Sequence, residues 1–243
     1  MKRIILTILA IIMLPISIFA ISGEEIVRLA DEAQTFKTAK SSGEFQVTDR
    51  FGTKITSFNS WARGESESFI EFTSRAERGQ KILRTKDEIY LYYPDAEELI
   101  RMQGSALRQG VLGSDISYED MTGGKDRAKQ YTIEITGEEK VLGRDCWILK
   151  LTAKTRTVPY PKEIVWIDKK SYLVLKGEYY TKSDRLLKEM EVLEIGIFDN
   201  IETAARTRIS DTMKSDSETV LVLKTFKANV ALDNRIFSLE ELW

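Results

Sequence analysis

The sequence predicts a mainly β protein with few helices, in which short strands follow one another as an antiparallel meander. Apolar and polar residues alternate over most of the chain from about residue 43 onward, as around Tyr131, Ile133 and Ile135, and a period of two is typical of strands with one buried face. Turn-forming pairs such as Gly143-Arg144 separate these runs. Clear helical periodicity occurs only near the N-terminus. We therefore expect roughly ten or eleven strands.

The N-terminus has the layout of a cleavable secretory signal peptide. Lys2 and Arg3 form a short basic region, and residues 4–20 contain no charge. Small residues allow cleavage before Gly23, with cleavage after Ala20 as the competing position. An uncleaved membrane anchor is the alternative, but the apolar stretch falls short of the ~20 residues that a spanning helix needs. The signal peptide predicts export from the cytoplasm.

After removal of residues 1–22, residues 23–243 are expected to form a single periplasmic domain, because about 220 residues suffice for one sizeable core. Cys146 is the only cysteine and lies far from the signal peptide, so it offers neither an internal disulfide nor a site for N-terminal lipid attachment. The chain has a formal charge of −2 and no clustered basic residues. A nucleic-acid partner is therefore not expected.

The sequence contains no histidine, which removes the usual general base near neutral pH and the commonest metal ligand. Ser-His-Asp catalysis, Cys-His catalysis and His-ligated zinc sites are excluded. A carboxylate or lysine enzyme is still possible, but the 38 Asp and Glu residues single out no particular pair. We expect no enzymatic activity, no metal site and no cofactor.

One amphipathic helix is predicted from about residue 24 to 36. Ile26 and Ala30 share one face of this helix at helical spacing. Ser22 is placed to cap its N-terminus, and Glu25 three residues later completes a capping box. This segment is one of only two that can cover a broad sheet.

The second covering segment is the connection at residues 102–128, which interrupts the strand pattern. Glycines flank and interrupt its apolar residues Leu107, Val111 and Leu112. Long connections without strands are uncommon inside a compact domain and often act as lids or binding loops. Because glycine lowers the cost of backbone rearrangement, we expect residues 104–113 to form a lid that moves relative to the sheet.

A sheet of this size must bury one face by stacking on a second sheet, by closing into a barrel or by curling around helices. Too few helical residues are predicted to cover it tightly, so a curled sheet would leave an apolar cavity, which such sheets often use for a ligand. The alternative is that Phe72, Trp147, Trp166 and their neighbours fill an ordinary core.

Five stretches carry a family resemblance. They are residues 78–84 (RGQKILR), 90–94 (YLYYP), 113–121 (GSDISYEDM), 173–180 (LVLKGEYY) and 235–239 (RIFSL). Taken together and in this order, they resemble the outer-membrane lipoprotein-sorting family, the LolA-like proteins of the bacterial periplasm. The resemblance covers about residues 24 to 243, and the 113–121 block is its most specific part.

This resemblance implies an incomplete antiparallel β-barrel with a helical lid across its open mouth. It implies an apolar cavity that shelters the acyl chains of lipids or lipoproteins during transfer between membranes, with transient membrane contact. An inner-membrane exporter complex is the partner that the resemblance suggests. The alternative is a periplasmic sensor or interaction module that binds a partner protein with the same fold.

Two groups of residues are the candidate site. The cavity and its lid are expected to comprise Phe72, Ile82, Tyr90, Tyr92, Leu107, Val111, Leu112, Tyr131, Ile133, Trp147, Leu149, Leu151, Leu173 and Leu175. A motif near the mouth is expected to comprise Gly113, Asp115, Tyr118 and Glu119. The motif either shapes the mouth or contacts a partner, or else it forms a capping turn without ligand contact.

Overall fold

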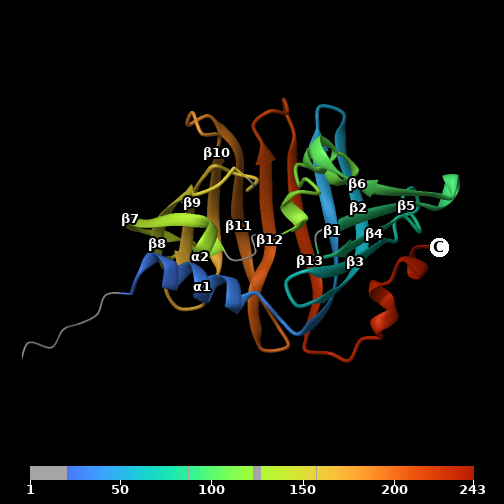
Figure 1. Ribbon diagram of the computed structural model, residues 1–243, viewed down its shortest axis with the longest axis horizontal. Helices are drawn as coiled ribbons and strands as arrows, with labels where there is room; N and C mark the ends of the chain where they lie inside the picture. Colours follow the sequence, from blue (N-terminus) through green and yellow to red (C-terminus); the bar gives the residue numbers. More distant parts are fainter. Residues whose placement is uncertain (1–20, 87, 123–126, 157) are drawn as a thin grey trace, which may run out of the picture.

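The computed structural model describes residues 21–86, 88–122, 127–156 and 158–243, and Figure 1 shows its ribbon. The predicted signal peptide lies almost wholly outside the described residues. Most of the chain forms one curled antiparallel sheet, as predicted, with two α-helices in the described part. The strands are β1 (Thr38–Asp49), β2 (Gly52–Arg63), β3 (Glu67–Phe72), β4 (Lys81–Thr85), β5 (Glu88–Tyr93), β6 (Glu98–Met102), β7 (Tyr131–Val141), β8 (Arg144–Ala153), β9 (Lys162–Asp168), β10 (Val174–Tyr180), β11 (Leu186–Phe198), β12 (Ile201–Asp211) and β13 (Glu218–Ala228).

The sheet contains 13 strands, more than the ten or eleven expected. Strands β4 and β6 have only five residues each, which gives a period of two too few positions to be evident. All strands that are consecutive in the chain pair with each other except β6 and β7, and β1 also pairs with β13. The two edge strands, β6 and β7, are therefore consecutive in the chain and unpaired with each other, so the sheet does not close into a barrel.

The long connection between β6 and β7 joins one edge of the sheet to the other and packs on its concave face, where Val111 and Tyr118 contact the inner side chains of β1–β6. It contains the 3-10 helices η2 (Gly104–Arg108), η3 (Val111–Gly113) and η4 (Asp120–Thr122), and it ends in the short helix α2 (Arg127–Gln130). In Figure 1 these pieces lie in front of the central strands. The helical lid predicted for this segment is present as a covering element.

Helix α1 (Gly23–Ala33) begins where predicted. The Ser22 side chain accepts a hydrogen bond from the Glu25 backbone N–H at 3.2 Å, which satisfies one of the free amides of the first turn. The helix ends at Ala33 rather than near residue 36, because Phe36 already packs its ring against Phe226 of β13 at 5.2 Å. The chain thus leaves the helix to enter β1.

Four clusters of apolar side chains form the core. One lies between the inner face of β1–β6 and the β6–β7 connection, and a second lies between the inner face of β7–β9 and α1. A third gathers Cys146 and Trp166 with Leu173, Leu175 and Val192. The fourth covers the outer face of β3–β6 with the C-terminal 3-10 helices η5 (Asn234–Phe237) and η6 (Leu239–Leu242).

Candidate functional site

Both ends of the concave face are covered, and the middle is hollow. The β6–β7 connection fills the end formed by β1–β6, and α1 fills the end formed by β7–β9. Between them a cavity of about 670 Å³ lies over the central strands β10–β13 and β1. This volume falls within the range of small-molecule sites, about 300–1,000 Å³.

The floor of the cavity is apolar and its rim is polar. The apolar side chains come from β10 to β13 and are Val174, Met190, Val192, Ala204, Leu221, Leu223 and Phe226. The polar and charged lining residues are Asp31, Gln34, Thr35, Ser41, Glu65, Arg127, Tyr179, Thr203 and Thr207. An apolar floor with few polar groups at the rim suits an elongated apolar ligand with a polar end.

A second hollow of about 210 Å³ adjoins the first. Five lining residues are common to both: Gln34, Ser41, Gly64, Thr203 and Phe226. The smaller hollow extends toward the C-terminal end of α1, where Ala33 and Leu173 line it. A ligand longer than the main cavity therefore has a place to continue.

Arg127 of α2 is the cation of the cavity wall. Its guanidinium donates to Glu163 Oε2 of β9 at 2.9 Å, and a second nitrogen lies 3.7 Å from Asp31 Oδ1 of α1. Burial acts to lower the pKa of Arg127, but the carboxylates of Glu163 and Asp31 outweigh it and raise the pKa above its usual value. The guanidinium is therefore charged, and it ties both covering helices to the sheet.

Tyr179, which lines the cavity, stays uncharged. Burial first, and the nearby Glu163 carboxylate second, raise the pKa of Tyr179 well above its usual value. Its ring also contacts the ring of Tyr160, with centroids 4.7 Å apart. The phenol is thus available to a ligand only as a neutral hydrogen-bonding group.

The 113–121 block fastens the β6–β7 connection to the sheet. The Asp115 backbone N–H donates to Thr219 Oγ1 at 2.8 Å. The Asp115 carboxylate accepts from Thr219 Oγ1 at 2.7 Å and from Ser217 Oγ at 2.9 Å. Lys214 Nζ donates to the Gly113 carbonyl at 3.0 Å and also to the Ser114 carbonyl. We call residues 113–121 the lid block.

The far end of the lid block is held in a second place. Asp120 accepts hydrogen bonds from Tyr160 Oη at 2.5 Å and from Lys188 Nζ of β11. Lys188 is almost fully buried on the concave face. A buried lysine needs a partner of this kind, because an unpaired ammonium is costly away from water. The two anchor points, Asp115 and Asp120, thus attach the lid block to β13 and β11.

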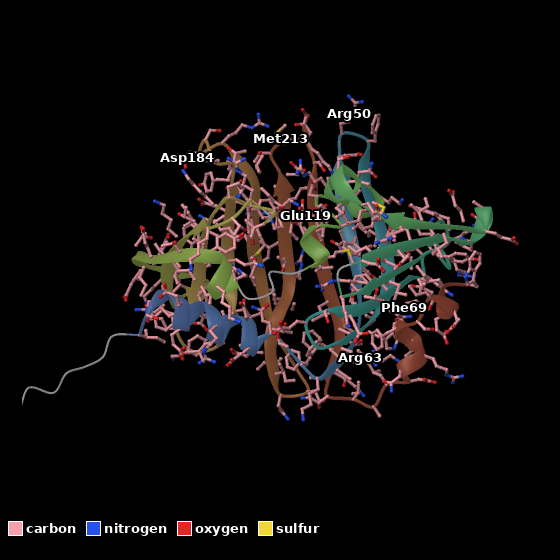
Figure 2. All side chains as sticks on the ribbon, viewed as in Figure 1. Arg50, Arg63, Phe69, Glu119, Asp184 and Met213 are labelled. Atoms are coloured by element: carbon pink, nitrogen blue, oxygen red, sulfur yellow. The ribbon has the colours of Figure 1, made fainter. Side chains whose placement is uncertain are left out.

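The predicted motif residues all lie in this block. Gly113 has a positive φ of 83°, which favours glycine. The ring of Tyr118 is buried against the inner cluster of β1–β6. The Glu119 backbone N–H donates to the Leu107 carbonyl at 2.7 Å, so the block folds back on η2. These contacts hold the block in shape and on the sheet. In Figure 2, Glu119 lies in front of the central strands.

The structure distributes the predicted cavity residues over all four clusters rather than bringing them together. Phe72, Ile82, Leu107, Val111 and Leu112 belong to the cluster beneath the β6–β7 connection. Tyr131, Ile133, Trp147, Leu149 and Leu151 belong to the cluster beneath α1. Leu173 and Leu175 belong to the third cluster, and Leu173 also lines the smaller hollow. These residues do not line the main cavity.

Tyr90 and Tyr92 lie on the opposite face of the sheet. They pack with Phe69 and Leu83 under the C-terminal residues, and the ring of Tyr92 contacts Trp243 at 5.4 Å. The physical reason is their alternation with Ile89 and Leu91, which occupy the inner face. The two tyrosines therefore belong to the outer surface and not to the cavity.

The residues that do line the main cavity were missed in the sequence. Small side chains such as Thr203, Ala204 and Thr207 of β12 leave the space empty, yet they do not form a strong alternation. The available signal was the group of small residues Thr203, Ala204, Ala205 and Thr207, interrupted by Arg206. In the sheet, Thr207 pairs with the apolar Leu221 of β13. Cavities arise where inward side chains are small, not where they are large.

Two negative observations apply to the described residues alone. Within them, no group of three or more His, Cys, Asp or Glu side chains is placed to hold a metal ion. Across the same part of the chain, no helix is long and apolar enough to span a membrane.

Solved structures share this fold over nearly the whole chain. A DUF1329 family protein from Desulfovibrio piger matches with 26% identity and a TM-score of 0.83, covering 91% of this chain and 98% of that one. A proposed outer membrane lipoprotein-sorting protein domain from Vibrio parahaemolyticus matches with 19% identity and a TM-score of 0.80, covering 90% and 97%. A LolA superfamily protein from Nitrosomonas europaea matches with 22% identity and a TM-score of 0.74, covering 91% and 100%. Among curated proteins, none matches the chain.

The open antiparallel sheet, the helices across its concave face and these structural matches define the class as LolA-like. A family model with the description "Uncharacterized protein" matches residues 64–243, which is more than half of the chain. The chain belongs to the family that this model describes, and its fold is LolA-like.

Proposed function

We propose that this protein is a periplasmic carrier that binds the acyl chains of lipids or lipoproteins and transfers them between membranes. The observation that carries the proposal is the cavity of about 670 Å³ with an apolar floor over the central strands. The likeness of the fold to lipoprotein-sorting and LolA superfamily proteins supports it. In this proposal an inner-membrane exporter complex loads the carrier.

The energetics of the cavity suit reversible binding. Each buried methylene contributes ~0.8 kcal/mol, so about twelve would contribute roughly 10 kcal/mol before the costs of association. That is enough to extract a chain from a membrane surface only if the chain is shielded from water in the cavity. Release then requires the shield to open, since movement of a covering element changes the exposed area.

The charged rim favours the acyl part of a ligand over an anionic headgroup. Asp31 and Glu65 line the cavity beside Arg127, and Arg127 is already held by Glu163 and Asp31. An anionic headgroup would have to displace one of these carboxylates. We infer that the acyl chain enters the hollow and that the polar end stays at the rim or in water.

Filling the cavity tests this function. The substitution Thr207→Trp places an indole over the central strands, where Thr207 lines the cavity. We expect affinity for a fluorescent fatty acyl probe to fall by about tenfold or more, since excluding only two methylenes already has this effect. The matched control is Arg206→Trp, the neighbouring exposed residue of the same strand, which should bind the probe as the parent does.

The result that overturns the proposal is equal probe binding by the parent and the Thr207→Trp variant, or no uptake by the delipidated parent. The second outcome, together with an interior that remains empty after purification from membranes, would favour the alternative of a module that binds a partner protein. Native mass spectrometry of the purified parent provides the same information through co-purifying lipid.

A further inference from the structure

Three connections between strands lie side by side along one end of the sheet. The register pairs Thr48 of β1 with Glu218 of β13, so the β1–β2 and β12–β13 connections are neighbours. Lys188 of β11 pairs with Asp211 of β12, which places the β10–β11 connection next in line. Figure 2 shows Arg50, Met213 and Asp184, one from each connection, along the same margin of the molecule.

A fourth connection, residues 73–80 between β3 and β4, joins this end. The Ser57 backbone N–H of β2 donates to Ser74 Oγ at 2.6 Å, and Lys54 forms an ion pair with Glu77 at 2.6 Å. We call the four connections, residues 49–54, 73–80, 181–186 and 211–217, the docking edge.

Two large apolar side chains project from the docking edge, each beside an arginine. Phe51 is 83% exposed and Met213 is 60% exposed. The Arg50 guanidinium lies 4.7 Å from the centre of the Phe51 ring, and the Arg185 guanidinium contacts Met213 Sδ. An apolar tip with a flexible cation at its base is the arrangement that inserts into the boundary between lipid headgroups and acyl chains.

The charge of the docking edge differs in sign from that of the chain. Its four connections contain seven basic and five acidic residues, a net charge of +2, whereas the whole chain has −2. Two of the acidic residues already have basic partners, Glu77 with Lys54 and Asp184 with Lys162. A locally positive edge on a negative protein orients it toward an anionic surface.

The docking edge also adjoins the lid block. Lys214, in the β12–β13 connection, donates to the backbone carbonyls of Gly113 and Ser114. Ser217 of the same connection donates to Asp115. A surface that met Met213 would therefore lie next to the contacts that hold the lid block in place.

We propose that the docking edge binds the surface of an anionic phospholipid bilayer, with Phe51 and Met213 inserted and the neighbouring arginines at the headgroups. This inference rests on the proposed carrier function for its purpose, but it concerns a surface separate from the cavity. The occupant of the docking edge is a membrane rather than a partner protein, because its exposed apolar side chains fit the acyl chains and the cations beside them fit the headgroups.

Vesicle binding tests the proposal with the chain from residue 21 to residue 243. The protein should sediment with vesicles of equal parts phosphatidylglycerol and phosphatidylcholine, and this binding should weaken as salt is raised. The double variant Phe51→Ser with Met213→Ser should bind these vesicles about fivefold less or weaker still, because both inserted side chains are lost. The matched control is Ile197→Ser, since Ile197 is 71% exposed but lies in the hairpin at the other end of β11.

Three results would overturn the proposal: no binding of the parent to the vesicles, equal loss in the double variant and the Ile197→Ser control, or equal binding of the parent to pure phosphatidylcholine. The variants should retain the parent's uptake of the acyl probe, because none of the three residues lines the cavity. Uptake without vesicle binding would reject the docking edge alone, whereas vesicle binding without uptake would reject the carrier function alone.

Discussion

Asp168, at the end of β9, is one of several buried charges that hold covering segments and strands together. Its carboxylate accepts hydrogen bonds from the Ser171 backbone N–H at 3.1 Å, from Ser171 Oγ, and from Arg144 Nη1 at 3.1 Å. Arg144 in turn bonds Glu202 of β12 at 2.8 and 2.9 Å. Asp168 thus holds Arg144 of the neighbouring strand β8, and Arg144 connects β8 through Glu202 to β12, a strand with which β8 does not pair.

We expect the stability contributed by Asp168 to depend on pH. Burial acts to raise the pKa of Asp168, but the bonds from Ser171 and Arg144 prevail and lower the pKa below its ordinary value of 3.8. A depressed pKa in the folded state means that the stabilisation is complete above about pH 3.8 and is lost as the pH falls through the folded value. The substitution Asp168→Asn should cost about 2 kcal/mol near pH 7.

Denaturant unfolding of parent and variant at several pH values measures this difference. It should narrow as the pH falls below about 3.8. The control is Asp145→Asn, because Asp145 is an exposed partner of Lys140 and surface pairs contribute little. A difference for Asp168→Asn that does not change with pH would show that the charge of this carboxylate is not what stabilises the fold.

At the scale of the elements, helix α1 has a bearing on signal-peptide cleavage. Ser22 caps the helix through the Glu25 backbone N–H, and Ile21 packs against the cluster beneath the helix. Cleavage before Gly23 would remove both residues, whereas cleavage after Ala20 would keep them. The cap alone is worth ~1 kcal/mol.

We therefore predict that the exported protein begins at Ile21, the second of the two positions that the sequence allows. The intact mass of the protein purified from the periplasm measures the N-terminus directly. A chain prepared from Ile21 should also unfold at higher denaturant than one prepared from Gly23, by at least ~1 kcal/mol. A mass that begins at Gly23, with equal stability of the two chains, would contradict this prediction.

The sequence predicted the elements well where side chains are large and regularly spaced. The alternation around Trp147 and Leu149 placed β8 correctly, and the cap at Ser22 marked the start of α1. The sequence predicted the end of an element poorly where a contact with a distant part of the chain determines it. The end of α1 at Ala33 depends on the contact of Phe36 with Phe226, and the two aromatic residues are far apart in the chain.

At the scale of the whole molecule, the topology explains the position of the cavity. The two edge strands are joined by one connection that packs on the concave face, and α1 precedes β1 on that same face. The β6–β7 connection and α1 each cover one end of the concave face, and the middle of that face stays open. Most of the predicted site residues are large inward side chains, and these are the ones that the covering segments bury. Tyr90 and Tyr92 lie instead on the outer face. Local alternation identifies which face is inward but not which part of that face stays uncovered.

The same topology makes the lid block the attachment point of the β6–β7 connection, and we propose that this attachment loosens when a ligand enters or leaves the neighbouring cavity. It is held at Asp115 by Thr219, Ser217 and Lys214. The substitution Asp115→Ala removes the carboxylate from these partners and should weaken the attachment by about 2 kcal/mol. Opening of residues 104–117 should then be roughly thirtyfold more frequent, while the rest of the sheet keeps its protection.

Hydrogen exchange followed by mass spectrometry tests this last prediction. In the parent, exchange at residues 104–113 should be faster than in β8 and β9 and should change when the acyl probe is added, because Leu107 and Leu112 are only partly buried on the inner cluster. Asp115→Ala should speed this exchange and the release of bound probe, whereas Asp95→Ala, an exposed carboxylate in the β5–β6 connection, should change neither. If residues 104–113 exchange as slowly as the central strands with and without probe, then Leu107, Val111 and Leu112 are fixed core residues, and the ligand must enter by a route that does not move the lid block.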